Sequence, residues 1–192
     1  RFESRGLGDV YKRQLSNFII LTLSIHLLIT MITKKDLRDL YEWGKQTKFP
    51  LKKAPTIDGY SNIDIDYYWV KSVKKTTIIR SKFMNETVKK IYENDEILFS
   101  NYVIFYAGTK LSPHKDPKIL RHPYKRIQIP LYVPKGECYM QWTELKQEII
   151  KWEEGVSQVC DVCNHKHEAY NNTSEPIEFL FVDVHKDTEV EL

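Results

Sequence analysis

The chain has 192 residues, with 29 basic and 26 acidic side chains and a formal net charge of +3. This length allows one domain with a hydrophobic core and a shorter appendage. Hydrophobic residues make up 42% of the chain and charged residues 29%, which is typical of a soluble globular protein. Because the net charge is small and dispersed, we expect no nucleic-acid partner. Three cysteines are an odd number, which favours a reducing compartment, and we predict a cytoplasmic location.

Residues 1–32 form a segment that we exclude from the predicted fold. Residues 1–14 (RFESRGLGDVYKRQ) lack apolar periodicity and resemble a translated sequencing adapter. Residues 15–32 are apolar but interrupted by polar side chains, and Met31 offers a later start. We therefore interpret 1–32 as a non-native or read-through leader. The alternatives are a signal-anchor helix, which would make the protein membrane-anchored, and a packed helix.

Two short helices are predicted ahead of the main domain. Thr33 and Asp36 have the spacing of a capping box, so we expect a helix from Lys34 to about Gly44. Prolines and a glycine mark residues 45–65 as a connection. Asn85 is a predicted N-cap for a second helix. The apolar face of that helix would consist of Val88, Ile91 and Tyr92.

Most of the remaining chain is predicted to form short strands. Residues 126–133 alternate, with Arg126 and Gln128 on one face, and Pro130 places this strand at a sheet edge or a bulge. Many short strands without intervening helices indicate a sandwich or barrel. The other face of that strand would carry Ile127, Ile129, Leu131 and Val133. The remaining strands are expected within 67–82 (two strands), 97–106, 138–142, 148–152, 156–160 and 177–184.

One pair of side chains suggests a metal site. His114 and Asp116 stand two residues apart, so in an extended chain both side chains project to the same face. Two further histidines, His165 and His167, follow about fifty residues later. Two histidines and one carboxylate form the facial triad of non-haem Fe(II) oxygenases. The spacing alone leaves open an exposed histidine beside a turn aspartate.

Additional motifs follow this pair in a characteristic order. They include a Trp-Glu-Glu-Gly run at 152–155, a His-Glu-Ala-Tyr-Asn run at 167–171 and an apolar strand at 179–184. Together with the histidine–aspartate pair, they resemble the aspartyl/asparaginyl β-hydroxylase family of Fe(II)/2-oxoglutarate oxygenases over residues 97–185. The resemblance implies a mainly β fold, a double-stranded β-helix of the jelly-roll or cupin type, here preceded by short N-terminal helices.

The resemblance also implies the roles of individual residues. His114, Asp116 and His167 would bind Fe(II), and they would be the catalytic residues. Arg126 and Gln128 would contact the cosubstrate 2-oxoglutarate, and O2 would take the remaining position on the metal. Some members have glycine where this chain has Asp116. The carboxylate restores a full triad and favours tighter binding of a hard cation.

The 2-oxoglutarate site departs from the family pattern. The family has Arg-x-His where this chain has Arg126 and Gln128. A second arginine normally follows the distal histidine by ten residues, where this chain has Ile177, and Val103 replaces a serine. Isoleucine cannot clamp a carboxylate as an arginine does. The chain thus has a different cosubstrate, is a binding-only relative, or uses another cation: Arg126, which we favour, Arg121, Lys125 or Lys110.

A zinc site is a competing interpretation of the same region. Cys160, Cys163, His165 and His167 are zinc-ligand types, but structural zinc sites usually separate the two ligand pairs by about a dozen residues. We therefore expect the cysteines to be small strand residues. His165 is an alternative distal ligand, although the motif that follows favours His167. Asp183 is expected to be structural.

We predict a helical lead-in at 33–65, a jelly-roll oxygenase domain at 66–186 and a tail at 187–192. The predicted function is an Fe(II)- and 2-oxoglutarate-dependent dioxygenase that hydroxylates an unactivated C–H of a protein, peptide or small-molecule substrate. The alternatives are a prolyl-hydroxylase-like oxygenase and a catalytically silent cupin-like binding module. A membrane partner is expected only if residues 15–32 are a genuine anchor.

Overall fold

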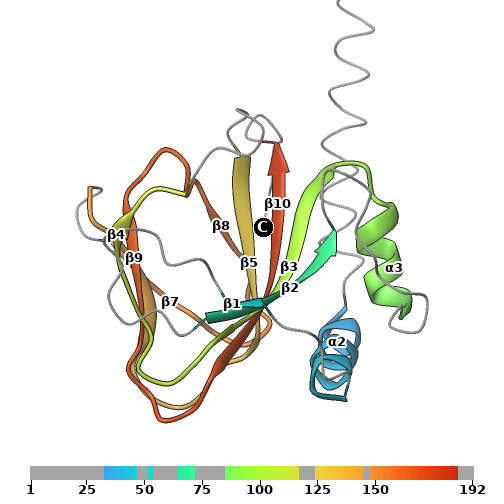
Figure 1. The fold of residues 1–192 in the computed structure, drawn as a ribbon, viewed down its shortest axis with the longest axis horizontal. Helices are drawn as coiled ribbons and strands as arrows, with labels where there is room; N and C mark the ends of the chain where they lie inside the picture. Colours follow the sequence, from blue (N-terminus) through green and yellow to red (C-terminus); the bar gives the residue numbers. More distant parts are fainter. Residues whose placement is uncertain are drawn as a thin grey trace, which may run out of the picture.

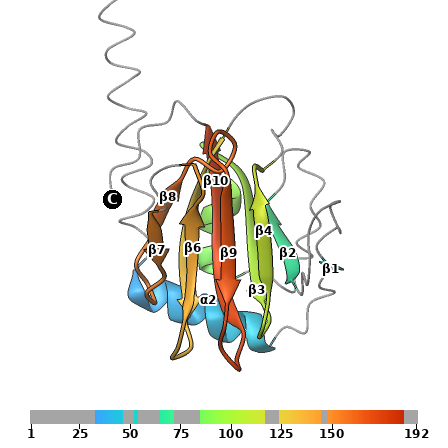
Figure 2. The same ribbon diagram turned by 90° about the vertical axis from the view of Figure 1, so that its left-hand side faces the viewer.

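Two antiparallel β-sheets face each other, and two helices cover the outer face of the larger sheet (Figure 1). The computed structural model describes residues 33–46, 52–53, 65–71, 85–116, 124–144 and 148–185. Seen face-on, the smaller sheet stands in front of the larger sheet, with the helices behind (Figure 2). The predicted mainly β jelly-roll architecture with short N-terminal helices is confirmed.

Of the strands that the structure describes, six form the larger sheet and four form the smaller sheet. The larger sheet has the order β1-β2-β3-β10-β5-β8, so the last of these strands in the chain lies at its centre. These strands are β1 (Lys52–Lys53), β2 (Ile65–Lys71), β3 (Ile97–Phe105), β10 (Ile177–His185), β5 (Tyr124–Tyr132) and β8 (Gln158–Cys160). The smaller sheet has the order β4 (Lys110–His114), β9 (His167–Asn171), β6 (Cys138–Trp142) and β7 (Ile149–Lys151).

Both predicted helices are present, and local capping explains where they begin. In α2 (Lys34–Gln46), the Thr33 backbone N–H donates to Asp36 at 2.8 Å and the Asp36 N–H donates back to the Thr33 hydroxyl at 3.2 Å. In α3 (Glu86–Glu93), the Asn85 side chain accepts a hydrogen bond from the backbone N–H of Val88 at 2.8 Å.

Helix α2 continues to Gln46, two residues past the predicted end at about Gly44. Glycine serves close packing at this position instead. A Cβ atom on Gly44 would lie 2.5 Å from ring atoms of Tyr102, so only glycine lets α2 approach the large sheet this closely.

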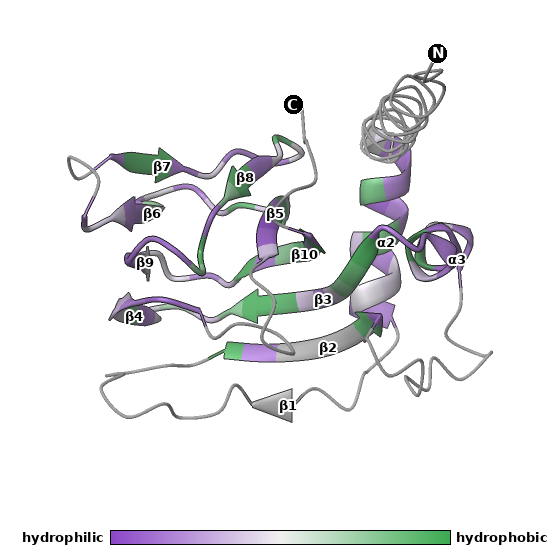
Figure 3. Ribbon diagram, turned by 90° about the horizontal axis from the view of Figure 1, so that it is seen from above, coloured by the Kyte–Doolittle hydropathy of each residue, from purple (hydrophilic) through white to green (hydrophobic). Residues whose placement is uncertain are grey.

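The large sheet is apolar on both faces because each face covers a separate core. On β10, Phe179 and Phe181 face the small sheet, whereas Leu180 and Val182 pack beneath the helices. This arrangement explains why residues 177–184 form a nearly continuous apolar run. The helices supply Leu40, Val88 and Ile91 to the outer core, and Figure 3 shows the three layers from above.

The strand containing Pro130 is not an edge strand, since β5 pairs with β10 on one side and β8 on the other. The alternative prediction of a bulge is confirmed, because the β5–β10 register is irregular where Phe179 pairs with Pro130. Strand β8 pairs only with residues 126–128, so its ladder of hydrogen bonds does not extend to the proline. Val133 follows the end of β5 and packs in the core between the sheets, away from Ile127.

Some predictions concern residues that the structure does not describe. These include the leader at 1–32, most of the connection at 45–65, the second strand expected within 67–82, and the tail at 187–192. The predicted domain limits therefore stay predictions. None of the described helices has the length and apolar character needed to cross a membrane.

Candidate metal centre

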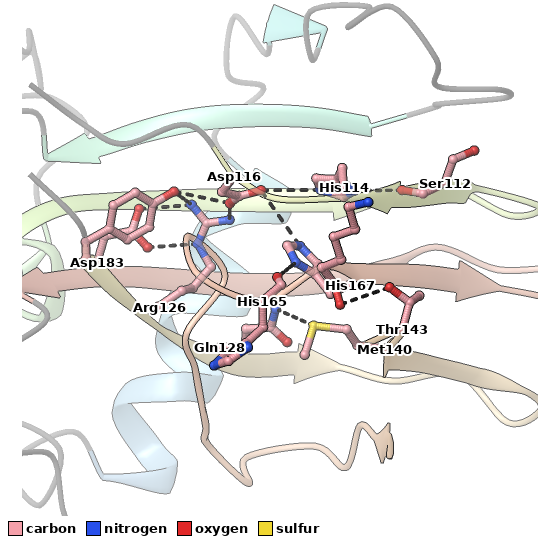
Figure 4. A network of polar contacts seen from close by, with 12 residues as sticks. Ser112, His114, Asp116, Arg126, Gln128, Met140, Thr143, His165, His167 and Asp183 are labelled. Atoms are coloured by element: carbon pink, nitrogen blue, oxygen red, sulfur yellow. Dashed lines mark hydrogen bonds and ion pairs between the residues drawn. The ribbon is translucent and has the colours of Figure 1, made fainter. Parts of the chain in front are cut away.

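The predicted triad comes together at one end of the small sheet. His114, the last residue of β4, pairs in register with His167, the first residue of β9, and Asp116 follows β4 by two residues. Asp116 Oδ1 lies 3.3 Å from His114 Nε2 and 3.7 Å from His167 Nε2 (Figure 4). The three candidate ligand atoms all lie within 4.8 Å of one another, which is compatible with a shared metal ion.

Each imidazole is oriented by the backbone carbonyl of the residue two positions earlier in the chain. His114 Nδ1 lies 2.7 Å from the carbonyl oxygen of Ser112, and His167 Nδ1 lies 3.3 Å from that of His165. An Nδ1–H that donates to a carbonyl leaves the Nε2 lone pair available to a metal. Both Nε2 atoms face Asp116, so the donor set fits a divalent cation.

The two oxygens of Asp116 have different surroundings. Oδ1 faces the histidines, whereas Oδ2 accepts hydrogen bonds from Arg126 Nη1 at 2.7 Å and the Tyr124 hydroxyl at 3.1 Å. The Asp116 backbone N–H also donates to the Val162 carbonyl at 2.9 Å. Burial opposes ionisation of Asp116, but Arg126 and His114 outweigh it and hold the pKa of Asp116 well below its usual range.

The environment of His167 favours the neutral form that a metal requires. Its side chain is buried, and burial lowers the pKa of His167 from 6.5 to about 4. The edge of Trp142 packs against this ring, with centroids 5.8 Å apart, and against His165 at 5.9 Å. His165 stands outside the triad and contributes its backbone carbonyl to His167.

Arg126, the predicted cosubstrate anchor, is held between two carboxylates. Beyond its contact with Asp116, its Nε and Nη2 donate to the two oxygens of Asp183 at 2.8 and 3.0 Å. Nη2 also donates to the Tyr124 hydroxyl at 3.1 Å. The guanidinium carbon lies 4.8 Å from the centroid of the Phe181 ring. The charge of Arg126 is therefore balanced within the protein.

Gln128 and Ile177, the other residues compared with the family's cosubstrate site, are also committed to the interior. Gln128 is buried, accepts a hydrogen bond from Trp152 Nε1 at 2.9 Å, and lies 3.5 Å from the sulfur of Met140. Ile177 is fully buried in the aromatic core between the sheets. Neither side chain carries a positive charge that could bind a carboxylate.

The remaining candidate cations stand elsewhere. The Lys110 ammonium lies 5.1 Å from the centroid of the Tyr170 ring. Lys125 alternates with Tyr124 and Arg126 on β5, so its side chain leaves the opposite face of the sheet. Arg121 lies outside the described residues.

The cysteines take no part in the triad. Cys160 and Cys163 are free and buried, and burial raises the pKa of Cys160 to about 12 and also raises that of Cys163. Within the described residues, the three-ligand group is formed by His114, Asp116 and His167.

Sequence reasoning missed Asp183 and Tyr124 as neighbours of the metal centre. Both lie on strands of the large sheet and face the small sheet with Arg126. A usable signal did exist. An arginine that faces the interior of the protein needs a buried acid, and Asp183 is the acid on the inner face of β10.

The chain is similar in fold to several solved structures, whereas no curated protein matches it. Solved structures with a similar fold include a predicted oxalate decarboxylase from Thermotoga maritima, which is 11% identical with a TM-score of 0.45 over 72% of this chain and 95% of that one. A polyketide cyclase from Streptomyces resistomycificus is 8% identical, with a TM-score of 0.46 over 76% and 84%. A DMSP lyase from Ruegeria pomeroyi is 15% identical, with a TM-score of 0.44 over 73% and 59%.

The sequence-family comparison covers most of the jelly roll. The model of the family described as aspartyl/asparaginyl β-hydroxylase matches residues 70–187, which is more than half of the chain. The matched residues include all three members of the triad and Arg126. The chain therefore belongs to the aspartyl/asparaginyl β-hydroxylase family.

Proposed function

We propose that this protein is an Fe(II)-dependent oxygenase that uses O2 to hydroxylate an unactivated C–H, with 2-oxoglutarate as cosubstrate. The observation that carries the proposal is that two histidine nitrogens and one Asp116 oxygen lie within 4.8 Å of one another. Such a triad binds one face of non-haem Fe(II) and leaves the other positions open. Membership of a metal-dependent hydroxylase family supports the same chemistry.

The residues of the chain hold and tune the metal site. His114 and His167 would supply neutral nitrogen ligands, and Asp116 would supply one anionic oxygen. Bound Fe(II) would supply the redox chemistry with O2. Hydrogen bonds from Arg126 and Tyr124 to Oδ2 leave Oδ1 as the oxygen of Asp116 that would face the metal.

The residues that we predicted to hold 2-oxoglutarate do not fit that task in this structure. Arg126 is paired with two carboxylates, Gln128 with Trp152 and Met140, and Ile177 is apolar and fully buried. The cosubstrate enters the proposal from the family alone, and we assign no residue to it. The same observation favours one second candidate: a metal-binding cupin module without catalytic activity. The proposed substrate is a protein, a peptide or a small molecule.

An anaerobic titration with Fe(II), followed by 2-oxoglutarate, tests the proposal. The signal is the weak visible charge-transfer band of the iron–2-oxoglutarate chelate, and His114→Ala and Asp116→Ala are the controls. We expect a saturable band that both substitutions abolish. Iron binding without the band would contradict the assigned cosubstrate and favour the silent module. No iron binding would refute the oxygenase proposal.

A further inference from the structure

Arg126 links the metal centre to a buried acid that lies behind it. Its Nε and Nη2 bind both oxygens of Asp183, and its Nη1 binds Asp116 (Figure 4). With the Tyr124 contact, four of the five N–H groups of the guanidinium have partners. Aromatic rings also hold this group, because its carbon lies 4.8 Å from the Phe181 centroid and 5.5 Å from the Tyr124 centroid.

Burial makes these contacts hard to break. The Asp183 side chain is 2% exposed and that of Arg126 is 15% exposed. Pulling the arginine toward another ligand would leave Asp183 as an unpaired buried charge, which is strongly unfavourable. The guanidinium is therefore fixed at the ligand carboxylate, with one oxygen of Asp116 turned to it and the other to the histidines.

We propose that Asp183 and Arg126 are positioning residues that hold the metal ligand Asp116, and that Arg126 consequently does not anchor the carboxylate of an incoming cosubstrate. This inference rests on the proposed metal-binding function of the triad. Asp183 fixes the fork of Arg126, and Arg126 fixes the orientation of Asp116. Asp183 also offsets the positive charge that Arg126 places beside a cation site.

The charges around Asp116 predict that losing the Asp183 carboxylate weakens metal binding. Without the Asp183 carboxylate, the whole positive charge of Arg126 would act on Asp116, competing with the metal for its electrons and repelling the cation. Loss of groups that orient metal ligands typically weakens metal binding by about 10- to 100-fold. Lysine at position 126 would present a single point charge that cannot bridge two carboxylates as the arginine fork does.

The test is a titration with Co(II), which is stable in air and has a visible spectrum that reports ligand geometry. Asp183→Asn and Arg126→Lys should each bind Co(II) about 10- to 100-fold more weakly and show an altered spectrum. Glu178→Gln is the matched control, because Glu178 is a buried acid on the same strand that bonds to Tyr102 on the other face. It should bind Co(II) as the parent protein does.

Thermal melts of the metal-free variants separate positioning from a purely structural role. Should Asp183→Asn fail to fold, Tyr124→Phe removes only the hydroxyl shared by Arg126 and Asp116, and it should weaken Co(II) binding in the same direction. Variants that melt earlier but bind Co(II) like the parent would overturn the inference. So would an Arg126→Lys protein with unchanged Co(II) affinity that has lost 2-oxoglutarate binding. A parent protein that binds no Co(II) would instead refute the metal function itself.

Discussion

Asn171 joins three parts of the fold through its side-chain amide. It ends β9, is fully buried, and its two N–H groups are shared among the carbonyls of Phe105, Tyr106 and Glu175 at 2.9 to 3.1 Å. Its Oδ1 accepts hydrogen bonds from the backbone and the hydroxyl of Thr173 at 3.1 and 2.7 Å. The asparagine of the family motif thus ties the end of β3 to β9, next to the turn that leads into β4.

We expect Asn171→Ala to lower the free energy of unfolding by about 3–5 kcal/mol. The amide has two donors and two accepting positions in use, and each buried hydrogen bond contributes about 0.5–1.5 kcal/mol net, with a further cost where a buried partner is left unsatisfied. Neighbouring Asn172 is the matched control. Its exposed amide donates to Glu137 at 3.1 Å, so Asn172→Ala should change stability by no more than about 0.5 kcal/mol.

Urea unfolding followed by tryptophan fluorescence would measure both variants, with equal denaturant slopes as the check that stabilities are comparable. A loss below about 1 kcal/mol for Asn171→Ala would refute the reasoning, because one buried hydrogen bond alone contributes that much. An equal loss of unfolding free energy in Asn171→Ala and Asn172→Ala would show that burial of the Asn171 amide does not make it more stabilising than the exposed amide of Asn172.

Three further effects are expected. Gly44→Ala should destabilise the protein by about 1–2 kcal/mol in thermal melts. The clash of the new Cβ with Tyr102 costs more than the roughly 1 kcal/mol that alanine gains over glycine in helix propensity. A stabilised variant would contradict this. Trp152→Phe should cost about 1–3 kcal/mol in urea unfolding, because it leaves the buried oxygen of Gln128 without its donor, and a change within 0.5 kcal/mol would argue against that bond. The metal-free protein should lose stability, by up to about 3 kcal/mol, as the pH falls from about 6.5 to 4, because unfolded chains protonate His167 near 6.5 whereas burial lowers its folded pKa to about 4. Melts across this range on the parent and His167→Asn proteins measure the effect, and identical pH profiles would contradict it.

Local patterns were sufficient to predict the elements but not their neighbours. Capping residues located both helices, and alternation identified the two faces of β5, because both signals depend on residues close in sequence. Strand order depends on pairing between distant segments. The central place of β10 and the interior place of β5 were therefore not predictable, and of the two positions expected for Pro130 the structure has the bulge, not the sheet edge.

The candidate site, too, was predicted in part from local motifs. Motifs at 114–116 and 167–171 located three side chains that the structure brings together. Asp183 escaped prediction as a partner of Arg126, because pairing between distant strands brings the two together. Tyr124 was missed because the predicted strand began at Arg126, two residues after it. The family pattern assigned the arginine to an external carboxylate, whereas the fold supplies two internal ones.

Substituting His165 and His167 separately tests whether His114, Asp116 and His167 bind a divalent metal. Isothermal titration of Co(II) into the parent, His167→Ala and His165→Ala proteins measures affinity and stoichiometry together. We expect one ion per parent chain, loss of binding in His167→Ala, and retained binding in His165→Ala, since the backbone carbonyl that orients His167 remains. Binding that survives in His167→Ala but disappears in His165→Ala would show that the triad described above is not the metal site.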